Sequence, residues 1–190
     1  KGASPRGHDH RGRWEEMLDT CTSSNGTMES ANATHQTELG LPGRINPFNG
    51  EEVARMVGGI LGRKHFEDSL GGCIFTFRTR IEFLARALSA ATGWTYTLAD
   101  AIRLGRRTAA ILRAFNLRCG IGTDLEYPSA RYGSQPVDGP AKDHNIMDQW
   151  ERMREVWYET VGYDIKAGKP TRGTLKELGL DWLAKDLWRK

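Results

Sequence analysis

TLADAIRLGRRTAAILRAF, residues 97–115, carries the signals of a long helix. Thr97 and Asp100 form a capping box, in which each side chain accepts a hydrogen bond from the backbone N–H of the other residue at the helix start. Four residues then follow at helical spacing on one stripe, the pattern typical of a helix that faces a core. These residues are Leu104, Thr108, Ile111 and Phe115, and four arginines (Arg103, Arg106, Arg107 and Arg113) lie off the stripe.

Four further segments repeat the helical spacing of apolar residues and carry a capping or stop residue at an end. They lie near residues 51–62 (Asn49 cap, Gly62 stop), 81–93 (Gly93 stop), 146–162 (Gly162 stop) and 171–179 (Thr171 cap, Gly179 stop). No convincing run of alternating β-type residues is present, so the sequence predicts a mainly α fold with about five helices.

Two long stretches have loop composition, residues 1–50 and 120–142, and residues 67–78 read as a tight loop between helices. Glycine, serine, asparagine, threonine and proline are frequent in the first stretch, and periodic apolar positions are few. The sequence therefore divides into a loop-rich segment, 1–50, and a helical domain, 51–190.

Composition narrows the class of protein. The chain has 190 residues, 38% of them hydrophobic, which is enough for a substantial core and excludes a disordered tail. No apolar run approaches the ~20 residues that span a bilayer, and no signal-peptide pattern is present. Three separated cysteines, Cys21, Cys73 and Cys119, argue against a secreted disulfide scaffold. We therefore expect a cytoplasmic protein.

The arginines of residues 103–118 leave two interpretations open. They could form a basic stripe for RNA, which would make the chain a non-catalytic helical RNA- or protein-binding module. However, the net charge of +3 is small, and acids such as Asp124 and Glu126 lie close in sequence. A solvated or ion-paired helix face without nucleic acid is the better account.

One short motif suggests chemistry: DSLGGC, from Asp68 through Gly71 and Gly72 to Cys73. A double glycine lets backbone amides approach a ligand, a carboxylate can accept paired N–H donors from a heterocycle, and a thiolate can bind a metal cluster. The competing interpretation is a turn with a buried cysteine, which is common in proteins. We expect Cys119, after an apolar helix, to be buried and not a metal ligand.

Two other polar stretches contain candidate residues. Glu29 is a lone carboxylate in a polar loop and could act as a general acid or base if it were buried. His8, Asp9 and His10 are ordinary metal ligands by residue type, but adjacent residues in a loop are more often solvated.

Six motifs in order resemble the C-terminal part of the aldehyde ferredoxin oxidoreductase family, the tungsten-pterin enzymes. The motifs are PRGHD (5–9), TSSNG (22–26), DSLGGC (68–73), FNLRCG (115–120), the Asp124–Pro128–Arg131 region, and the closing GYD, GKPT and LGL (162–164, 168–171 and 178–180). The resemblance covers nearly the whole chain. It implies a helical C-terminal domain with long ordered loops around a cofactor.

The resemblance also implies the cofactors and their ligands. A tungsten (or molybdenum) bis-pterin would lie beside a [4Fe–4S] cluster, with Cys73 as the last of four cluster ligands and Asp68 at the pyrimidine edge of a pterin. Gly71, Gly72, Ile74 and Asn25 would line the cofactor. The other three cluster cysteines are absent, so the partners implied are the N-terminal part of the enzyme or a companion chain, and ferredoxin or an electron-transfer subunit.

The implied reaction is oxidation of an aldehyde to a carboxylic acid, with electrons passed to ferredoxin. Two departures from the family pattern leave a second branch open: Glu29 stands where aldehyde-oxidising members carry a catalytic histidine, and Gly72 replaces a leucine. The PRGHD opening (5–9) and Glu29 are closer to branches of unassigned substrate, and one related branch is the tungsten subunit of the ATP-independent benzoyl-CoA reductases.

Overall fold

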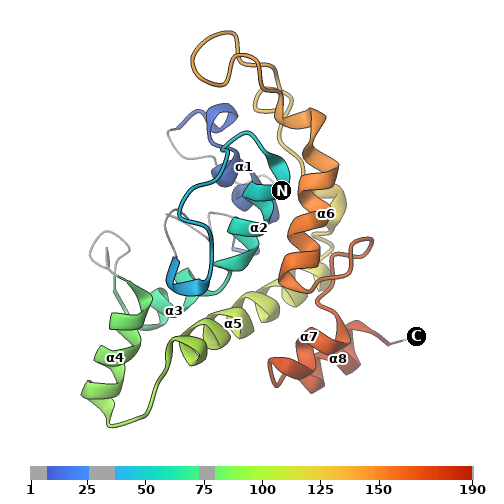
Figure 1. The fold of residues 1–190 in the computed structure, drawn as a ribbon. Coiled ribbons are helices and arrows are strands. Elements are labelled where there is room, and N and C mark those ends of the chain that lie inside the picture. Colours follow the sequence, from blue (N-terminus) through green and yellow to red (C-terminus); the bar gives the residue numbers. More distant parts are fainter. Residues whose placement is uncertain (1–7, 26–36, 73–79, 190) are drawn as a thin grey trace.

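The fold is mainly helical in the computed structural model, which describes residues 8–25, 37–72 and 80–189 (Figure 1). The α-helices are α1 Trp14–Thr22, α2 Gly50–Gly59, α3 Arg63–Ser69, α4 Ile81–Thr92, α5 Leu98–Arg118, α6 Trp150–Val161, α7 Arg172–Glu177 and α8 Asp181–Leu187. Short 3₁₀ turns are η1 His10–Gly12, η2 Thr37–Leu39, η3 Thr123–Leu125 and η4 Ile146–Asp148. Within these described ranges there is no β-strand, which confirms the predicted fold class.

Helix α5 runs through the middle of the fold, with α1 and α2 on one side and α7 and α8 on the other (Figure 1). It contributes a small residue to each of three hydrophobic clusters. Ala109 joins the cluster of α1, α2 and α6, Ala110 and Ala114 join that of α7 and α8, and Ala101 joins that of α3 and α4. Because alanine side chains are short, several elements can approach this one helix closely.

The closest crossing joins the start of α3 to α5. Gly62, which precedes α3, has a φ of 103° in the left-handed region, where glycine is favoured. A Cβ on Gly105 would fall well inside van der Waals contact with the Gly62 carbonyl. The two backbones therefore touch at this point, and glycine is required at both positions.

The predicted helix ends are largely confirmed. Asn49 accepts a hydrogen bond from the Glu52 N–H at 3.1 Å, and Thr97 and Asp100 form the expected capping box. Gly93 and Gly162 end α4 and α6 with φ of 76° and 77°. Gly62 is the exception, because α2 already ends at Gly59 and Gly62 begins the next helix.

Three helices are missing from the sequence prediction. Helix α1 lies inside the loop-rich segment 1–50 and buries Trp14, Met17, Leu18 and Cys21 at helical spacing. Helix α3 includes Asp68, which we expected in a loop. Helix α8 follows Gly179 and adds Leu183 and Leu187 to the second cluster. Each of these helices has only a short apolar repeat, and the polar or glycine-rich residues around it made the segment read as a loop.

The stripe predicted on α5 is wrong as a core face. Ile111 is 40% exposed and Phe115 is 63% exposed. Apart from Arg113, the buried positions are instead the small ones, from Ala101 through Gly105 to Ala114. Three clusters pack against this one helix, and small side chains let them approach it closely. Hydrophobic periodicity takes no account of side-chain size, so it could not identify this face.

A buried polar cluster ties α5 to α6 and to two loops. Arg113 donates to the Glu126 carboxylate and to the Gly168 carbonyl (2.8 Å), and the Tyr158 hydroxyl also donates to Glu126. Trp150 Nε1 donates to the Glu126 carbonyl at 3.1 Å. Burial opposes the charge on Arg113, but the Glu126 carboxylate outweighs it and raises the pKa of the guanidinium. Every charge in the cluster is thus paired, as a buried charge requires.

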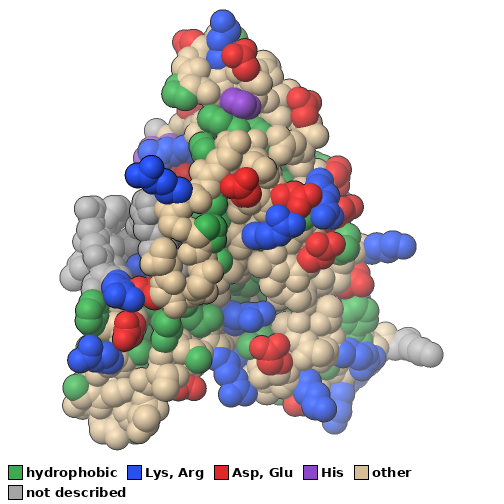
Figure 2. Space-filling model, in the orientation of Figure 1, with side chains coloured by type: hydrophobic (Ala, Val, Ile, Leu, Met, Phe, Trp, Pro, Cys, Tyr) green, Lys and Arg blue, Asp and Glu red, His purple; other side chains and the backbone are tan. Residues whose placement is uncertain are grey.

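The surface carries basic and acidic side chains close to one another, as the face drawn in Figure 2 shows. None of the described helices has the length and apolar character that crossing a bilayer would need.

Candidate functional site

The end of α3 presents a half-exposed carboxylate. Asp68 lies in the last turn, with its side chain 45% exposed, and both carboxylate oxygens lie 2.7 Å from Lys64 Nζ. The Lys64 side chain is 16% exposed, so most of its length is covered while its ammonium holds the Asp68 carboxylate in place. An exposed i,i+4 pair of this kind adds little stability, and its acceptor oxygens stay accessible to a ligand.

The chain turns away immediately after Asp68. The Gly71 N–H donates to the Asp68 carbonyl at 3.0 Å, and Gly71 has a φ of 72°. A Cβ at Gly71 would meet no atom of the described residues within 4 Å, so these residues leave the backbone at Gly71 uncovered on that side. Gly72 is the last residue described before the gap. Asp68 and Gly71 therefore border the same open edge of the molecule.

The opposite side of α3 is fixed to the core. Arg63 Nε donates to Glu67 Oε1 at 2.9 Å in a buried i,i+4 pair, and Phe66 is fully buried with its ring stacked 6.0 Å from Tyr96. Burial raises the pKa of the Glu67 carboxyl, against the influence of Arg63. The anchored inner side of α3 therefore sets the direction in which Lys64 and Asp68 face.

A second polar edge lies at the end of α1. Asp19, Thr22 and Ser23 are buried polar residues there, and the Ser23 hydroxyl donates to Asn25 Oδ1 at 2.7 Å. Asn116 on α5 donates through Nδ2 to the Ser24 carbonyl at 2.5 Å. The serine-rich segment after α1 is thus tied to α5 across 92 positions of sequence, a contact that no local sequence signal indicates.

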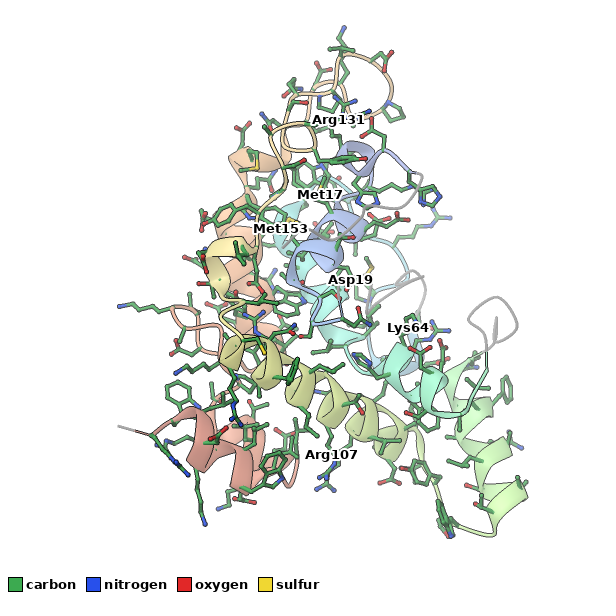
Figure 3. The ribbon with its side chains drawn as sticks, turned by 180° about the vertical axis from the view of Figure 1, so that it is seen from behind. Met17, Asp19, Lys64, Arg107, Arg131 and Met153 are labelled. Atoms are coloured by element: carbon green, nitrogen blue, oxygen red, sulfur yellow. The ribbon has the colours of Figure 1, made fainter. Side chains whose placement is uncertain are left out.

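Figure 3 shows the two edges together. Asp19, near the end of α1, and Lys64, on α3, both lie on the upper side of α5 in this view. Three of the predicted site residues, Glu29, Cys73 and Ile74, lie outside the described residues, so their roles stay predictions. Among the residues that are described, no group of three or more His, Cys, Asp or Glu side chains could hold a metal ion.

The His8–Asp9–His10 stretch pairs with its own neighbours. His8 Nδ1 lies 2.9 Å from Glu16 Oε2, and Asp9 pairs with Arg11 through contacts of 2.6–3.2 Å. His10 is 1% exposed, 5.8 Å from the Tyr132 ring, and burial lowers its pKa. The interpretation as a solvated loop was therefore wrong for His10, which is buried.

The arginines of α5 serve several different contacts. Arg113 belongs to the buried cluster, while Arg106 donates to the Val161 carbonyl at 3.2 Å and Arg107 to the Leu178 carbonyl. These contacts fit the ion-paired interpretation for Arg113 and give Arg106 and Arg107 a role in joining helices. Cys119 is exposed, so the expectation that it is buried was wrong, because it follows the last turn of α5 instead of lying on its inner side.

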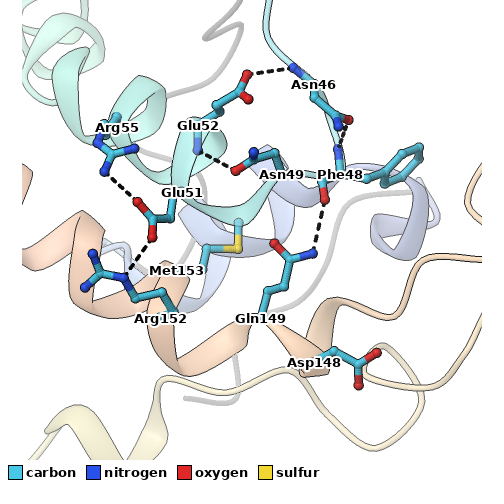
Figure 4. A pocket seen from close by; sticks show the side chains of 10 residues that line it. All are labelled: Asn46, Phe48, Asn49, Glu51, Glu52, Arg55, Asp148, Gln149, Arg152 and Met153. Carbon is cyan, nitrogen blue, oxygen red and sulfur yellow. Dashed lines mark hydrogen bonds and ion pairs between the residues drawn. The ribbon is translucent and has the colours of Figure 1, made fainter.

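A groove of about 580 Å³ lies between the starts of α2 and α6 and was not predicted (Figure 4). Glu51 pairs with Arg55 at 2.6 Å and with Arg152 at 2.9 Å. The Gln149 side chain accepts from the Gly50 N–H at 2.8 Å and donates to the Phe48 carbonyl at 3.2 Å. Because these polar groups satisfy one another, the groove is best understood as the joint between the two helices.

Comparison with known proteins gives the family. Residues 1–180 match the family model described as aldehyde ferredoxin oxidoreductase, domains 2 and 3. The tungsten-containing aldehyde ferredoxin oxidoreductases of Pyrococcus furiosus and Pyrococcus horikoshii are each 28% identical over 179 residues, 91% and 92% of this chain. That of Thermococcus kodakarensis is 27% identical over 179 residues, 91% of this chain.

The chain spans 29% of the length of these relatives. The family match confirms the resemblance drawn from the six motifs, and it agrees with the mainly helical fold. On this match over residues 1–180, the chain belongs to the aldehyde ferredoxin oxidoreductase family, within its C-terminal domains 2 and 3.

Proposed function

We propose that this segment is part of a tungsten- (or molybdenum-) bis-pterin and [4Fe–4S] oxidoreductase that oxidises an aldehyde to a carboxylic acid and passes electrons to ferredoxin. The observation that carries the proposal is the Asp68 carboxylate, half-exposed at the end of α3 and five residues before Cys73 in a segment that matches the family.

The residues at this edge fit the implied group. The Asp68 oxygens are accessible acceptors for the N–H groups of a pterin, and among the described residues nothing crowds Gly71, so a ligand could approach the backbone closely there. Cys73 would supply a thiolate to the cluster, and Gly72 and Ile74 would flank it. When bound, the pterin-held metal would accept two electrons from the substrate and the cluster would pass them on singly.

The chain's own contribution is to hold and orient. The Arg63–Glu67 pair and the Gly62–Gly105 crossing fix α3, and α3 in turn fixes Asp68. Asn116 fixes Ser24 and thereby the start of the segment from Asn25 toward Glu29. In this proposal Glu29 takes up a proton released as the aldehyde and water become the acid, the work of a general base.

A second candidate function is that of the tungsten subunit of an ATP-independent benzoyl-CoA reductase. Two sequence features favour it, Glu29 in place of a histidine and the PRGHD opening at residues 5–9. Turnover assays of the complete enzyme separate the two candidates: aldehyde-dependent reduction of ferredoxin supports the first, and reduction of an aromatic acyl thioester supports the second.

The test of the shared cofactor is Cys73→Ala in the complete enzyme. The cluster signal in electron paramagnetic resonance should be lost, together with most electron transfer, because one of four thiolate ligands is removed. Cys119→Ala is the matched control, since Cys119 is exposed, and it should leave the spectrum intact. A normal cluster spectrum in Cys73→Ala would show that this assignment is wrong. A colourless enzyme that binds RNA in a salt-sensitive manner would instead favour a binding module.

A further inference from the structure

The Lys64 ammonium lies directly in front of the Asp68 carboxylate. Its Nζ is 2.7 Å from Oδ1 and 2.7 Å from Oδ2, so it bonds both oxygens at once and lies between them. A carboxylate has about four lone-pair sites, one pointing forward and one pointing outward on each oxygen. Lys64 therefore uses the forward site of each oxygen, and the 45% exposure of the Asp68 side chain leaves the outward sites to other donors.

The forward sites are the ones that a paired donor needs. Two parallel N–H groups, as on a guanidinium or on the pyrimidine edge of a pterin, reach the two oxygens of one carboxylate side by side from the front. The outward lone pairs diverge, so they accept two separate donors but not two parallel ones. Lys64 and a paired N–H edge therefore compete for one position on Asp68.

The Lys64–Asp68 pair is suited to such an exchange. An exposed i,i+4 ion pair adds little stability, so breaking it costs little. A lysine ammonium is a compact charge on a flexible stem, whereas the planar fork of an arginine matches a carboxylate through two bonds. The neighbouring Arg63–Glu67 pair on the same helix is the opposite case, because its side chains are 9% and 3% exposed and it fixes α3 to the core. Only the outer pair of α3 can open without disturbing the packing.

We propose that Lys64 is a placeholder on Asp68, which a ligand with paired N–H donors displaces. The inference rests on the proposed function for the identity of that ligand, the pyrimidine edge of a pterin. The ammonium must turn away before both carboxylate oxygens can accept from the pterin, so Lys64 sets how readily Asp68 takes up the ligand. A residue that served only to orient Asp68 would have the opposite effect, because its removal would weaken binding.

The test measures how free pterin, which is fluorescent, binds to the complete enzyme prepared from cells grown without tungsten or molybdenum. Fluorescence polarisation gives the affinity for the wild type and for two variants. Lys64→Met removes the ammonium and keeps an apolar stem, so pterin should bind several-fold more tightly. Lys64→Arg places a planar fork on both oxygens, so pterin should bind several-fold more weakly. Weaker binding by Lys64→Met, equal binding by all three proteins, or binding by none of them overturns the proposal.

Two controls show whether the effect passes through Asp68. Arg55→Met breaks another exposed i,i+4 pair, with Glu51 on α2, and should leave pterin binding unchanged. In an Asp68→Asn background the two Lys64 substitutions should no longer change the affinity, because the shared acceptor is gone. An effect of Lys64 that persisted in that background would show direct contact with the ligand and would overturn the proposal.

This inference and the proposed function can fail separately, because the order of pterin affinities needs no metal. A native enzyme with neither tungsten nor molybdenum would contradict the proposed function, while tighter pterin binding by Lys64→Met would still support the placeholder. Conversely, an enzyme that loses its tungsten or molybdenum in Asp68→Asn, but shows no difference among the Lys64 variants, would support the function and overturn the inference.

Discussion

Two polar clusters in this chain contain an acid–base pair, yet their surroundings are opposite. The Arg113–Glu126 pair is 1% and 0% exposed, and Tyr158, a backbone carbonyl and an indole N–H complete its hydrogen bonds. The Lys64–Asp68 pair is joined by two 2.7 Å contacts, but the carboxylate is 45% exposed, and no described atom would contact a Cβ at nearby Gly71. The first cluster is closed to any ligand, and the second is open to one.

This difference separates the residues that hold the fold from those available for chemistry. A buried, fully satisfied network fixes four segments to one another and has no acceptor left for a ligand. The Asp68 carboxylate, at a helix end and paired with Lys64, contributes little to stability, and its oxygens stay accessible to a ligand. The predictions below test that division, from changes at closely packed, buried positions to changes at exposed ones.

The largest effect is expected from Arg113→Leu, which leaves Glu126 buried without its charged partner. Removing one member of a buried pair costs about 3–5 kcal/mol of the free energy of unfolding. Urea unfolding followed by circular dichroism measures it. Arg118→Leu is the control, since Arg118 is 68% exposed and pairs with Asp186, and it should cost at most about 1 kcal/mol. Equal losses in the two variants would contradict the division.

Gly105→Ala should come next in size. The added methyl group would collide with the Gly62 carbonyl, which is backbone and cannot rotate away, and overpacking of this kind costs about 1–3 kcal/mol. The control is Gly173→Ala in α7, where a Cβ has room and alanine favours the helix by up to about 1 kcal/mol. Thermal unfolding of both variants checks the difference. A Gly105→Ala protein as stable as the wild type would mean that α3 and α5 cross less closely.

Asp68→Asn should barely change stability. It removes an i,i+4 pair with a half-exposed acceptor, which is worth about 0.3–0.5 kcal/mol. The same urea titration as for Arg113→Leu gives the comparison on one scale. A loss of several kcal/mol would place Asp68 among the residues that hold the fold and would remove the main reason for assigning it to a ligand.

The smallest effect concerns acid pH. The side-chain hydrogen bond from Arg11 lowers the pKa of the Asp9 carboxyl from its usual 3.8 to about 2, against the opposing effect of burial. A lowered pKa in the folded state stabilises the fold above about pH 4, and that contribution is lost as the pH falls toward 2. Because Asp9 is 56% exposed, solvent screening limits it to a few tenths of a kcal/mol. Asp9→Asn should therefore be slightly less stable than wild type at pH 6, and the gap should close near pH 2.

Local signals explain what the sequence could predict. Caps and glycine stops depend on the adjacent backbone, which is why Thr97, Asn49, Gly93 and Gly162 were placed correctly. Helices α1 and α3 were missed because a short apolar repeat competes with polar or glycine-rich neighbours, and α3 in particular starts at the residue expected to stop α2. Periodicity also cannot show which face of a helix is buried when the neighbours are unknown.

The site shows the same limit. Asp68, Gly71 and Gly72 could be singled out because they are close together in sequence, and their role toward a ligand stays a prediction. The contact of Asn116 with Ser24, and the exposure of Phe115 beside it, depend on tertiary packing. Those features could not be read from spacing.

The central claim is that the open end of α3 holds a metal-pterin, and the metal content of the complete enzyme tests it most directly. The account predicts about one tungsten or molybdenum and about four iron atoms per copy of this segment. In Asp68→Asn it predicts a several-fold loss of tungsten or molybdenum, with iron retained and the thermal midpoint almost unchanged. A native enzyme with neither tungsten nor molybdenum, or an Asp68→Asn variant that keeps its full complement, would contradict the claim.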